Sequence, residues 1–213
     1  MSDTETYRGK TLTIHVDGAK CIHSRNCVVG LPGVFKANVE GPWIDADAAA
    51  AEEIAAIARA CPSGAITYER HDGIEGERAP DVNLLRVREN GPVALHGDLR
   101  IAGHAPCTRA TLCRCGASAR KPFCDGSHAG AGFTATGEPA TTQETAMLDG
   151  RGGTLEITAQ VDGPLRVAGN VEVVSGTGRL VRRATKLALC RCGGSANKPF
   201  CDGTHKTNGF TAP

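Results

Sequence analysis

The sequence predicts an α+β protein: a small α+β unit at the N-terminus, followed by a mostly-β pair of copies of one plan. The main observation is a repeat, because Cys113–His128 (CRCGASARKPFCDGSH) recurs as Cys190–His205 (CRCGGSANKPFCDGTH) at a constant offset of 77 residues. The first 70 residues lack this repeat and show the order strand, loop, helix, strand. Only five Phe, two Tyr and one Trp stand against 27 Gly, a composition typical of small cores and many turns.

The N-terminal unit contains three predictable elements. Residues 11–16 (TLTIHV) alternate apolar and polar side chains, which predicts a strand. After a loop rich in Gly and Pro, residues 48–60 place apolar side chains on one face of a helix, and Asp47 is expected to cap it. Residues 65–68 (AITY) predict a second strand.

The repeated plan extends beyond the cysteines. Residues 71–80 are polar and contain Gly and Pro, so a linker is expected there. Each copy then opens with Gly-Pro, continues with strand-like residues (93–101 and 165–174) and closes with Gly-Phe-Thr-Ala. The Gly-Pro pairs lie 72 residues apart rather than 77, so the second copy holds about five extra residues before its cysteines. The expected domains are 1–70, a linker at 71–84, a first copy at 85–135 and a second copy at 136–213.

Charge and hydropathy exclude several classes of function. Lys plus Arg (24) nearly balance Asp plus Glu (23) without a basic stripe, so nucleic acid is not an expected partner. The first residues (MSDTETYRGKTL) contain no apolar run of signal-peptide length, and no stretch reaches the ~18 apolar residues of a membrane span. A cytoplasmic protein without a membrane partner is therefore expected. Ten cysteines in that reducing compartment indicate metal ligation rather than disulfides.

The repeated motif has the order C-x-C-x8-C-x3-H. The eight predicted ligands are Cys113, Cys115, Cys124, His128, Cys190, Cys192, Cys201 and His205. Gly116 is expected to curl the chain so that the thiolates of both Cys113 and Cys115 face one metal. Ser118 is expected to donate to a thiolate or sulfide, and Asp125 to cap a short helix before the histidine. Their counterparts in the second copy should do the same.

Three cysteines and one histidine suit two kinds of metal site. They describe a closed tetrahedral zinc site, and they equally suit a [2Fe–2S] cluster. Zinc ribbons and fingers usually join C-x2-C or H-x3–5-H pairs through longer spacers. The spacing therefore favours the cluster, while zinc stays open.

Both stretches resemble the CDGSH iron–sulfur domain (NEET) family, whose pattern C-x-C-x2-[ST]-x3-P-x-C-D-G-[SAT]-H they match at every defined position. The tandem form resembles the soluble two-motif branch, in which one chain mimics the family's homodimer as an intramolecular pseudo-dimer. The resemblance covers about residues 85–212 and implies one [2Fe–2S] cluster per motif. It places Cys113 and Cys115 on an inner iron, and Cys124 and His128 on an outer, more exposed iron. The second copy would divide its ligands in the same way.

The histidine ligand determines the redox chemistry that we expect. A neutral imidazole in place of a thiolate makes a cluster less negative, so its potential should exceed the roughly −400 mV of plant-type ferredoxins. A proton on the ligand nitrogen competes with iron, which predicts a cluster that couples electrons to protons and is lost as the pH falls. Replacing both ligand histidines by cysteine should lower the potential and slow the loss in acid.

A looser pattern, C-x5-C followed by a distant Cys-Pro, is formed by Cys21, Cys27 and Cys61. With Gly-Pro-Trp-Ile at 41–44, it resembles the divergent single-cluster ferredoxin family over about residues 10–70. The resemblance implies a ferredoxin-like domain holding a [3Fe–4S] or [4Fe–4S] cluster on these cysteines. Ser24 stands where a four-cysteine ferredoxin has its middle cysteine, so a [4Fe–4S] cluster would need another ligand, such as His23, Ser24 or water. The alternative is a degenerate domain whose cysteines are simply small buried residues.

These patterns together predict an electron carrier or a protein that stores and transfers clusters. Its expected partner is a redox protein or an apo iron–sulfur acceptor. Two other classes stay open: a zinc-binding structural or interaction module, and a redox subunit of a larger oxidoreductase. The sequence contains no nucleophile–base arrangement and no P-loop, so it gives no support for an enzyme. Cys107 has no counterpart in the second copy and is expected to be a free thiol.

Overall fold

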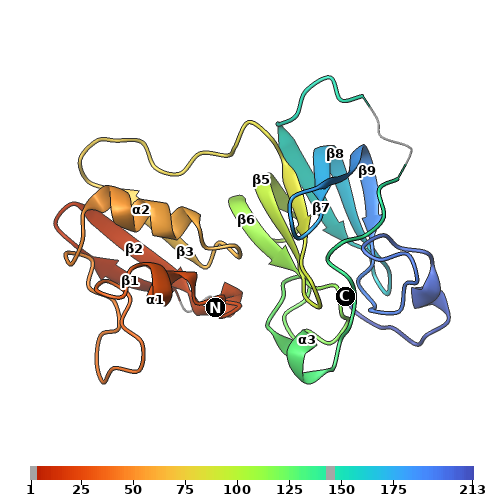
Figure 1. Ribbon diagram of the computed structural model, residues 1–213, viewed down its shortest axis with the longest axis horizontal. Coiled ribbons are helices and arrows are strands. Elements are labelled where there is room, and N and C mark those ends of the chain that lie inside the picture. Colours follow the sequence, from red (N-terminus) through yellow and green to blue (C-terminus); the bar gives the residue numbers. More distant parts are fainter. Residues whose placement is uncertain (1–3, 143–146) are drawn as a thin grey trace. The chain divides into compact units, whose positions relative to one another are not determined.

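The computed structural model describes residues 4–142 and 147–213, and the chain divides into two compact units, Met1–Arg78 and Ala79–Pro213 (Figure 1). The division lies within the segment 71–84, where a linker is expected. Strands prevail over helices in the described chain, in line with the mostly-β character predicted for the tandem part. No helix in those ranges is long and apolar enough to cross a membrane.

The N-terminal unit is a three-stranded antiparallel sheet in the order β1–β2–β3, packed against a helix. Its elements are β1 (Thr4–Arg8), β2 (Leu12–Asp17), the one-turn helix η1 (Gly18–Lys20), α1 (Asn26–Gly30), α2 (Ala51–Arg59) and β3 (Ile66–Arg70). Helix α2 buries Ile54, Ala55 and Ala58 in a core that also contains Leu12 and Ile14 of β2. The alternating residues of β2 and one face of α2 therefore form the core of this unit.

One expectation for this unit needs correction, and one of its strands was not predicted. The N-cap residue of α2 is Ala50, whose N–H donates to the Glu53 side chain at 3.1 Å. Asp47, the expected cap, instead accepts a hydrogen bond from Lys10 N at 2.8 Å and fastens the preceding loop to the sheet. Strand β1 has no counterpart among the predicted strands, because its sequence TETYR is mostly exposed and shows no apolar alternation.

The second unit consists of two copies of a three-stranded plan. The first copy has β4 (Leu84–Val87), β5 (Val93–Ile101) and β6 (Cys107–Leu112), and the second has β7 (Thr154–Ala159), β8 (Leu165–Val174) and β9 (Leu180–Leu189). Strands β5 and β8 occupy the predicted ranges 93–101 and 165–174. Strand β8 is one residue longer than β5, and β9 is four residues longer than β6. These differences account for the extra residues of the second copy.

The six strands of the two copies form one sheet, in which strands of one copy pair with strands of the other. Within each copy the neighbouring strands are antiparallel, but β4 also pairs in parallel with β8, and β7 pairs in parallel with β5. Strands β4 and β7, the first of each copy, therefore each pair with both β5 and β8. These strands lie side by side in Figure 1. One core results, which contains Leu85, Leu99 and Leu112 of the first copy together with Leu155 and Val173 of the second.

Candidate metal centres

Each repeated motif starts where a long strand ends. Strands β6 and β9 both stop one residue before the first motif cysteine. The chain then turns at Gly116 and Gly193, whose φ angles of +83° and +79° lie in the left-handed region that glycine favours. The turn brings the two Sγ atoms of each C-x-C together, 3.7 Å apart in the first copy and 3.9 Å in the second. The curl expected at this glycine is therefore present in both copies.

The two C-x-C loops also pack against each other. A Cβ atom on Gly116 would lie 2.7 Å from Cys192 O, and one on Gly193 would overlap Cys115 O. Both obstacles are main-chain atoms, so a side chain at either position would push the two copies apart. The glycines therefore serve two purposes, the turn itself and the contact between the motifs.

Main-chain hydrogen bonds bring the third cysteine of each motif beside the first two. Cys113 N donates to Pro122 O at 2.8 Å, and Cys124 N donates to Thr111 O at 2.9 Å. The second copy repeats both bonds, from Cys190 N to Pro199 O and from Cys201 N to Ala188 O. The backbone alone thus fixes the positions of these cysteines.

The histidine predicted as a ligand lies on a one-turn helix after the third cysteine, α3 (Ser127–Gly130) in the first copy and η2 (Thr204–Lys206) in the second. In the first copy Nδ1 of His128 lies 3.4 Å from Cys124 Sγ. In the second copy Nδ1 of His205 lies 2.9 Å from the carbonyl oxygen of Asp162. The two motifs therefore share their backbone but differ in the partner of the histidine.

Two polar residues of the motif do not act as predicted. Gly126, not Asp125, is the N-cap residue of α3, and Asp125 accepts the N–H of Ser127 at 3.0 Å. The Ser118 hydroxyl donates to Phe123 O at 2.7 Å and not to a sulfur atom. The second copy repeats both contacts at Asp202 and Ser195. These side chains therefore shape the loop rather than contact the ligands.

Main-chain N–H groups face the cysteine sulfurs. Cys115 Sγ accepts from Ala117 N and Cys124 Sγ accepts from Gly126 N, each at 3.4 Å, and the second copy has the same two contacts. A hydrogen bond from the Cys115 thiol, together with main-chain N–H groups of the loop, lowers the pKa of Cys113 despite its burial. The same hydrogen bond raises the pKa of Cys115, and burial raises those of Cys124 and Cys190. Donors of this kind favour the thiolate, the form that binds metals.

The predicted ligands gather in pairs. The separations of 3.7 and 3.9 Å within each C-x-C are close to the roughly 3.8 Å expected for two thiolates on one tetrahedral metal with bonds of about 2.3 Å. Cys124 and His128 form a second pair in the first copy. Among the residues that the structure describes, no three Cys, His, Asp or Glu side chains converge closely enough to bind a single metal ion.

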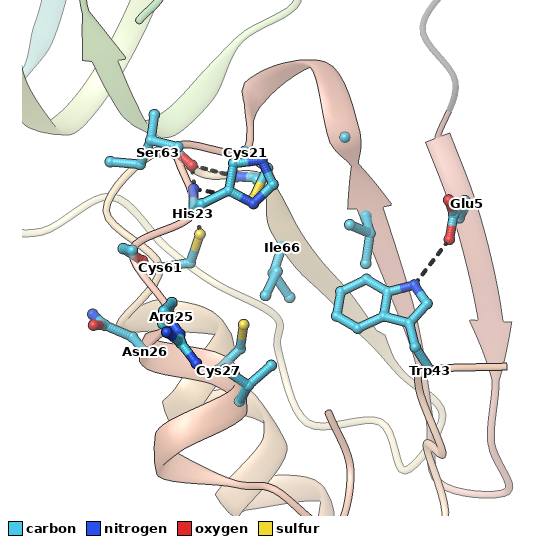
Figure 2. Close-up of a pocket in the computed structure, with 16 residues that line it drawn as sticks. Glu5, Cys21, His23, Arg25, Asn26, Cys27, Trp43, Cys61, Ser63 and Ile66 are labelled. Atoms are coloured by element: carbon cyan, nitrogen blue, oxygen red, sulfur yellow. Dashed lines mark hydrogen bonds between the residues drawn. The ribbon is translucent and has the colours of Figure 1, made fainter. Parts of the chain in front are cut away.

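The three N-terminal cysteines line one cavity of about 300 Å³ (Figure 2). Cys21 directly follows η1, Cys27 lies in the first turn of α1, and Cys61 follows α2. Figure 2 shows the sulfur atoms of Cys27 and Cys61 directed toward the same space. Cys21 Sγ accepts the N–H of His23 at 3.4 Å, and burial raises the pKa of Cys27. The fold thus gathers cysteines that lie far apart in the sequence.

The loop between Cys21 and Cys27 is sharply bent. His23 and Arg25 have φ angles of 52° and 64°, which are uncommon for residues other than glycine, and they bracket Ser24. Asn26 Nδ2 donates to Ala60 O at 3.1 Å and so ties this loop to the end of α2, next to Cys61. Sequence reasoning missed Asn26, whose only signal was its position before a cysteine. His23 and Ser24 also line the cavity.

Sequence reasoning also missed Arg114 and Arg191, the middle residues of the two C-R-C triplets. Each is only 1% exposed. All eight hydrogen bonds of the two guanidinium groups go to main-chain carbonyl oxygens, those of Arg88, Gly91, Ala135 and Thr136 for the first and of Gln160, Gly163, Ala212 and Pro213 for the second. These carbonyls lie in or beside the Gly-Pro and Gly-Phe-Thr-Ala segments, which explains why those segments recur with the motif.

Comparison with protein families matches two models to separate parts of the chain. The model described as "Iron-binding zinc finger CDGSH type" matches residues 90–129 and 162–206. The model described as "Divergent 4Fe-4S mono-cluster" matches residues 7–71. The uncharacterized protein YjdI of Escherichia coli K12 is 35% identical over 65 residues, which cover 30% of this chain and 83% of YjdI. The protein of the same name from E. coli O157:H7 matches equally.

Proposed function

The chain belongs to the iron-binding CDGSH family and carries a divergent 4Fe-4S mono-cluster domain at its N-terminus, and from this we propose that it holds two [2Fe–2S] clusters for one-electron transfer. The same clusters could serve storage and transfer to an apo iron–sulfur protein. Each cluster would be held by three cysteines and one histidine. The ligands are Cys113, Cys115, Cys124 and His128 for the first cluster, and Cys190, Cys192, Cys201 and His205 for the second.

The arrangement of the ligands in pairs is the observation that carries this proposal. A [2Fe–2S] cluster has two irons, and each takes two protein ligands. The close C-x-C pair of each motif fits one iron, and in the first motif the pair formed by Cys124 and His128 fits the other. In the second motif His205 lies against the carbonyl oxygen of Asp162. A single zinc ion would need all four ligands around one point, and the described residues offer no such convergence.

The surroundings of the ligands agree with an inner and an outer iron. Cys113 and Cys190 are 1% and 2% exposed, and their loops meet at Gly116 and Gly193, so the inner irons would lie near the contact between the copies. The strand exchange supports an intramolecular pseudo-dimer, because each copy completes the sheet of the other. The histidines are less buried than these cysteines, which suits an outer iron that exchanges electrons or is released.

We further propose a third cluster in the N-terminal unit. Cys21, Cys27 and Cys61 share a cavity without converging on one point, as expected when each thiolate binds a different iron of a [3Fe–4S] or [4Fe–4S] cluster. His23 and Ser24 border the same cavity and are the candidates for a fourth ligand. A cluster there would let the chain pass electrons between centres of different kinds.

Replacing His128 and His205 by Cys tests the ligand set. The double variant should keep both [2Fe–2S] clusters but show a lower reduction potential, because an anionic thiolate replaces a neutral imidazole on each outer iron. The measurement is a redox titration followed by visible and electron paramagnetic resonance spectra. The matched control is His71→Cys, which adds a thiol in the N-terminal unit and changes no predicted ligand. An unchanged potential in the double variant would show that these histidines do not bind the clusters.

A further inference from the structure

Arg114 and Arg191 carry a role beyond the shaping of the loops. We propose that each is a fixed positive charge that raises the reduction potential of the cluster in the other copy, so that the two clusters are electrostatically linked. The proposal rests on the proposed [2Fe–2S] clusters and adds residues that are not ligands. It is carried by the burial, the hydrogen bonds and the position of the two guanidinium groups.

Both guanidinium groups are buried cations held by dipoles rather than by ion pairs. At 1% exposure they are among the largest fully buried side chains of the described chain. Their eight hydrogen-bond acceptors are all carbonyl oxygens, so their hydrogen bonds neutralise no charge. A buried charge normally needs an opposite charge nearby. The carboxylates of Glu89 and Asp162 contribute part of that charge, and an anionic cluster coordinated by thiolates would add to it.

The position of each arginine points to the cluster of the other copy. The C-x-C loops touch at Gly116 and Gly193, so the motif of one copy lies against the motif of the other. The negative groups near Arg114 are Cys190 of the other copy and Glu89 and Cys115 of its own, and those near Arg191 are Cys113 of the other copy and Asp162 of its own. Both side chains stay cationic, because the ordinary pKa of arginine lies above 12.

Aromatic rings fix this arrangement across the copies. The Arg114 guanidinium lies 5.4 Å from the centre of the Phe133 ring, and Lys198 of the second copy lies 5.9 Å from the same ring. Arg191 and Lys121 contact the Phe210 ring in the same way, at 5.4 and 6.0 Å. Each ring is thus contacted by one cation from each copy. The closing Gly-Phe-Thr-Ala segments therefore hold the arginines in place against the partner motif.

The expected consequence is a shift in redox equilibrium. Reduction adds one negative charge to a cluster, and a nearby buried cation stabilises the reduced form more than the oxidised form. Because the interior screens charges poorly, removing one such cation should change the ratio of oxidised to reduced cluster at a fixed ambient potential by about tenfold. Surface lysines would have a much smaller effect, since water screens them.

The test compares Arg114→Gln with Arg114→Lys in the full-length protein. Glutamine removes the charge but still donates hydrogen bonds to carbonyls, whereas lysine keeps the charge and loses the planar fork. Iron, zinc and sulfide are counted first, and the loaded proteins are then titrated. We expect Arg114→Gln to lower the reduction potential, which favours the oxidised form, and Arg114→Lys to keep a potential near that of the parent protein. Equal shifts in both variants, or no shift in Arg114→Gln, would overturn the proposal.

Adding His128→Cys assigns the effect to one cluster. That change separates the first cluster by lowering its potential, so the remaining histidine-ligated signal belongs to the second cluster. In protein that carries Arg114→Gln with His128→Cys, the potential of the second cluster should shift more than that of the first. In protein that carries Arg191→Gln with His205→Cys, the potential of the first cluster should shift more than that of the second. A larger shift in the potential of the cluster that lies in the same copy as the substituted arginine would contradict the assignment to the other copy.

Loss of clusters is also informative. If the Gln variants fail to load while the Lys variants load with the parent potential, the charge is needed and the proposal stands. If Gln and Lys variants fail alike at both positions, the arginines are structural and the proposal falls. A parent protein that contains zinc and no sulfide would instead refute the proposed function, before any variant is compared.

Discussion

At the scale of single residues, two glycines control how closely the two motifs approach. Gly116 and Gly193 have positive φ angles, and each meets the main chain of the other copy where a Cβ atom would stand. A turn could be recognised at these positions from the sequence alone, because each glycine directly follows a C-x-C pair whose two thiolates must reach one metal. The contact across the copies could not, because it joins residues that lie 76 to 78 positions apart.

Gly193→Ala should therefore impair the loading of both clusters, not only the second. The left-handed backbone costs about 1–2 kcal/mol with a side chain, and the overlap with Cys115 O pushes on the first motif. The matched control is Gly103→Ala, because Gly103 has the same φ of +79° with open space around it. Thermal unfolding and iron counts on both variants make the comparison. Equal behaviour of the two would mean that backbone strain alone matters and that the contact between the motifs does not.

Other residues of the site show where pattern reading succeeds and fails. The pairing of cysteines follows from ligand spacing, and the structure brings Cys113 and Cys115 together as predicted. The role of Ser118 does not follow, because a hydroxyl can donate to any acceptor in reach, and in the structure it donates to the carbonyl of Phe123. The burial of Arg114 could not be predicted from the sequence, because arginine side chains are normally exposed. Only the fold shows that this one is buried.

At the scale of elements, the exchange of strands depends on Glu172 as well as on the core. Glu172 lies in the half of β8 that pairs with β4, and it is 4% exposed. Its carboxylate accepts two hydrogen bonds at 2.9 Å from Arg151, just before β7, and one at 3.0 Å from Arg183 of β9. One side chain thus joins three segments of the second copy at the point where the first copy inserts its strand.

Glu172→Gln should lower the free energy of unfolding at pH 7 by about 1–3 kcal/mol, because charged hydrogen bonds are lost from a buried position. Hydrogen bonds from Arg151 lower the pKa of Glu172 in the folded protein. Its stabilising effect is therefore complete above its ordinary value near 4.3 and is lost as the pH falls through the lower folded value. Unfolding measured from pH 7 downward should show a difference between parent and variant that is constant at first and then shrinks. Glu156→Gln, at an exposed position of β7, should match the parent. A difference that grows on acidification would contradict this assignment.

Elements that are amphipathic on their own were predictable, and elements that depend on partners were not. Strands β5 and β8 and the core face of α2 follow from local alternation or periodicity. Strand β1 and helix α1 are short and have no buried residue, so they carry no apolar pattern. The parallel pairs β4–β8 and β5–β7 leave no local trace in the sequence, because each strand is also a good antiparallel partner within its own copy.

At the scale of the whole molecule, two small cores and three candidate metal centres fit the composition. Few aromatic residues and many glycines limit the apolar area available, and bound metal groups commonly stabilise such domains. The N-terminal unit brings three cysteines to one cavity, and the tandem unit carries four predicted ligands in each motif. The family matches fall on the same parts of the chain. The central claim is therefore that all three centres hold iron–sulfur clusters.

The most direct test is to count iron, zinc and acid-labile sulfide on freshly purified, anaerobically handled protein, together with its visible spectrum. Two [2Fe–2S] clusters and one N-terminal cluster predict a coloured protein with about seven or eight irons and about eight sulfides per chain. About four irons and four sulfides would keep the tandem clusters but leave the N-terminal cavity empty. A colourless protein with about two zinc ions and no sulfide would contradict the account.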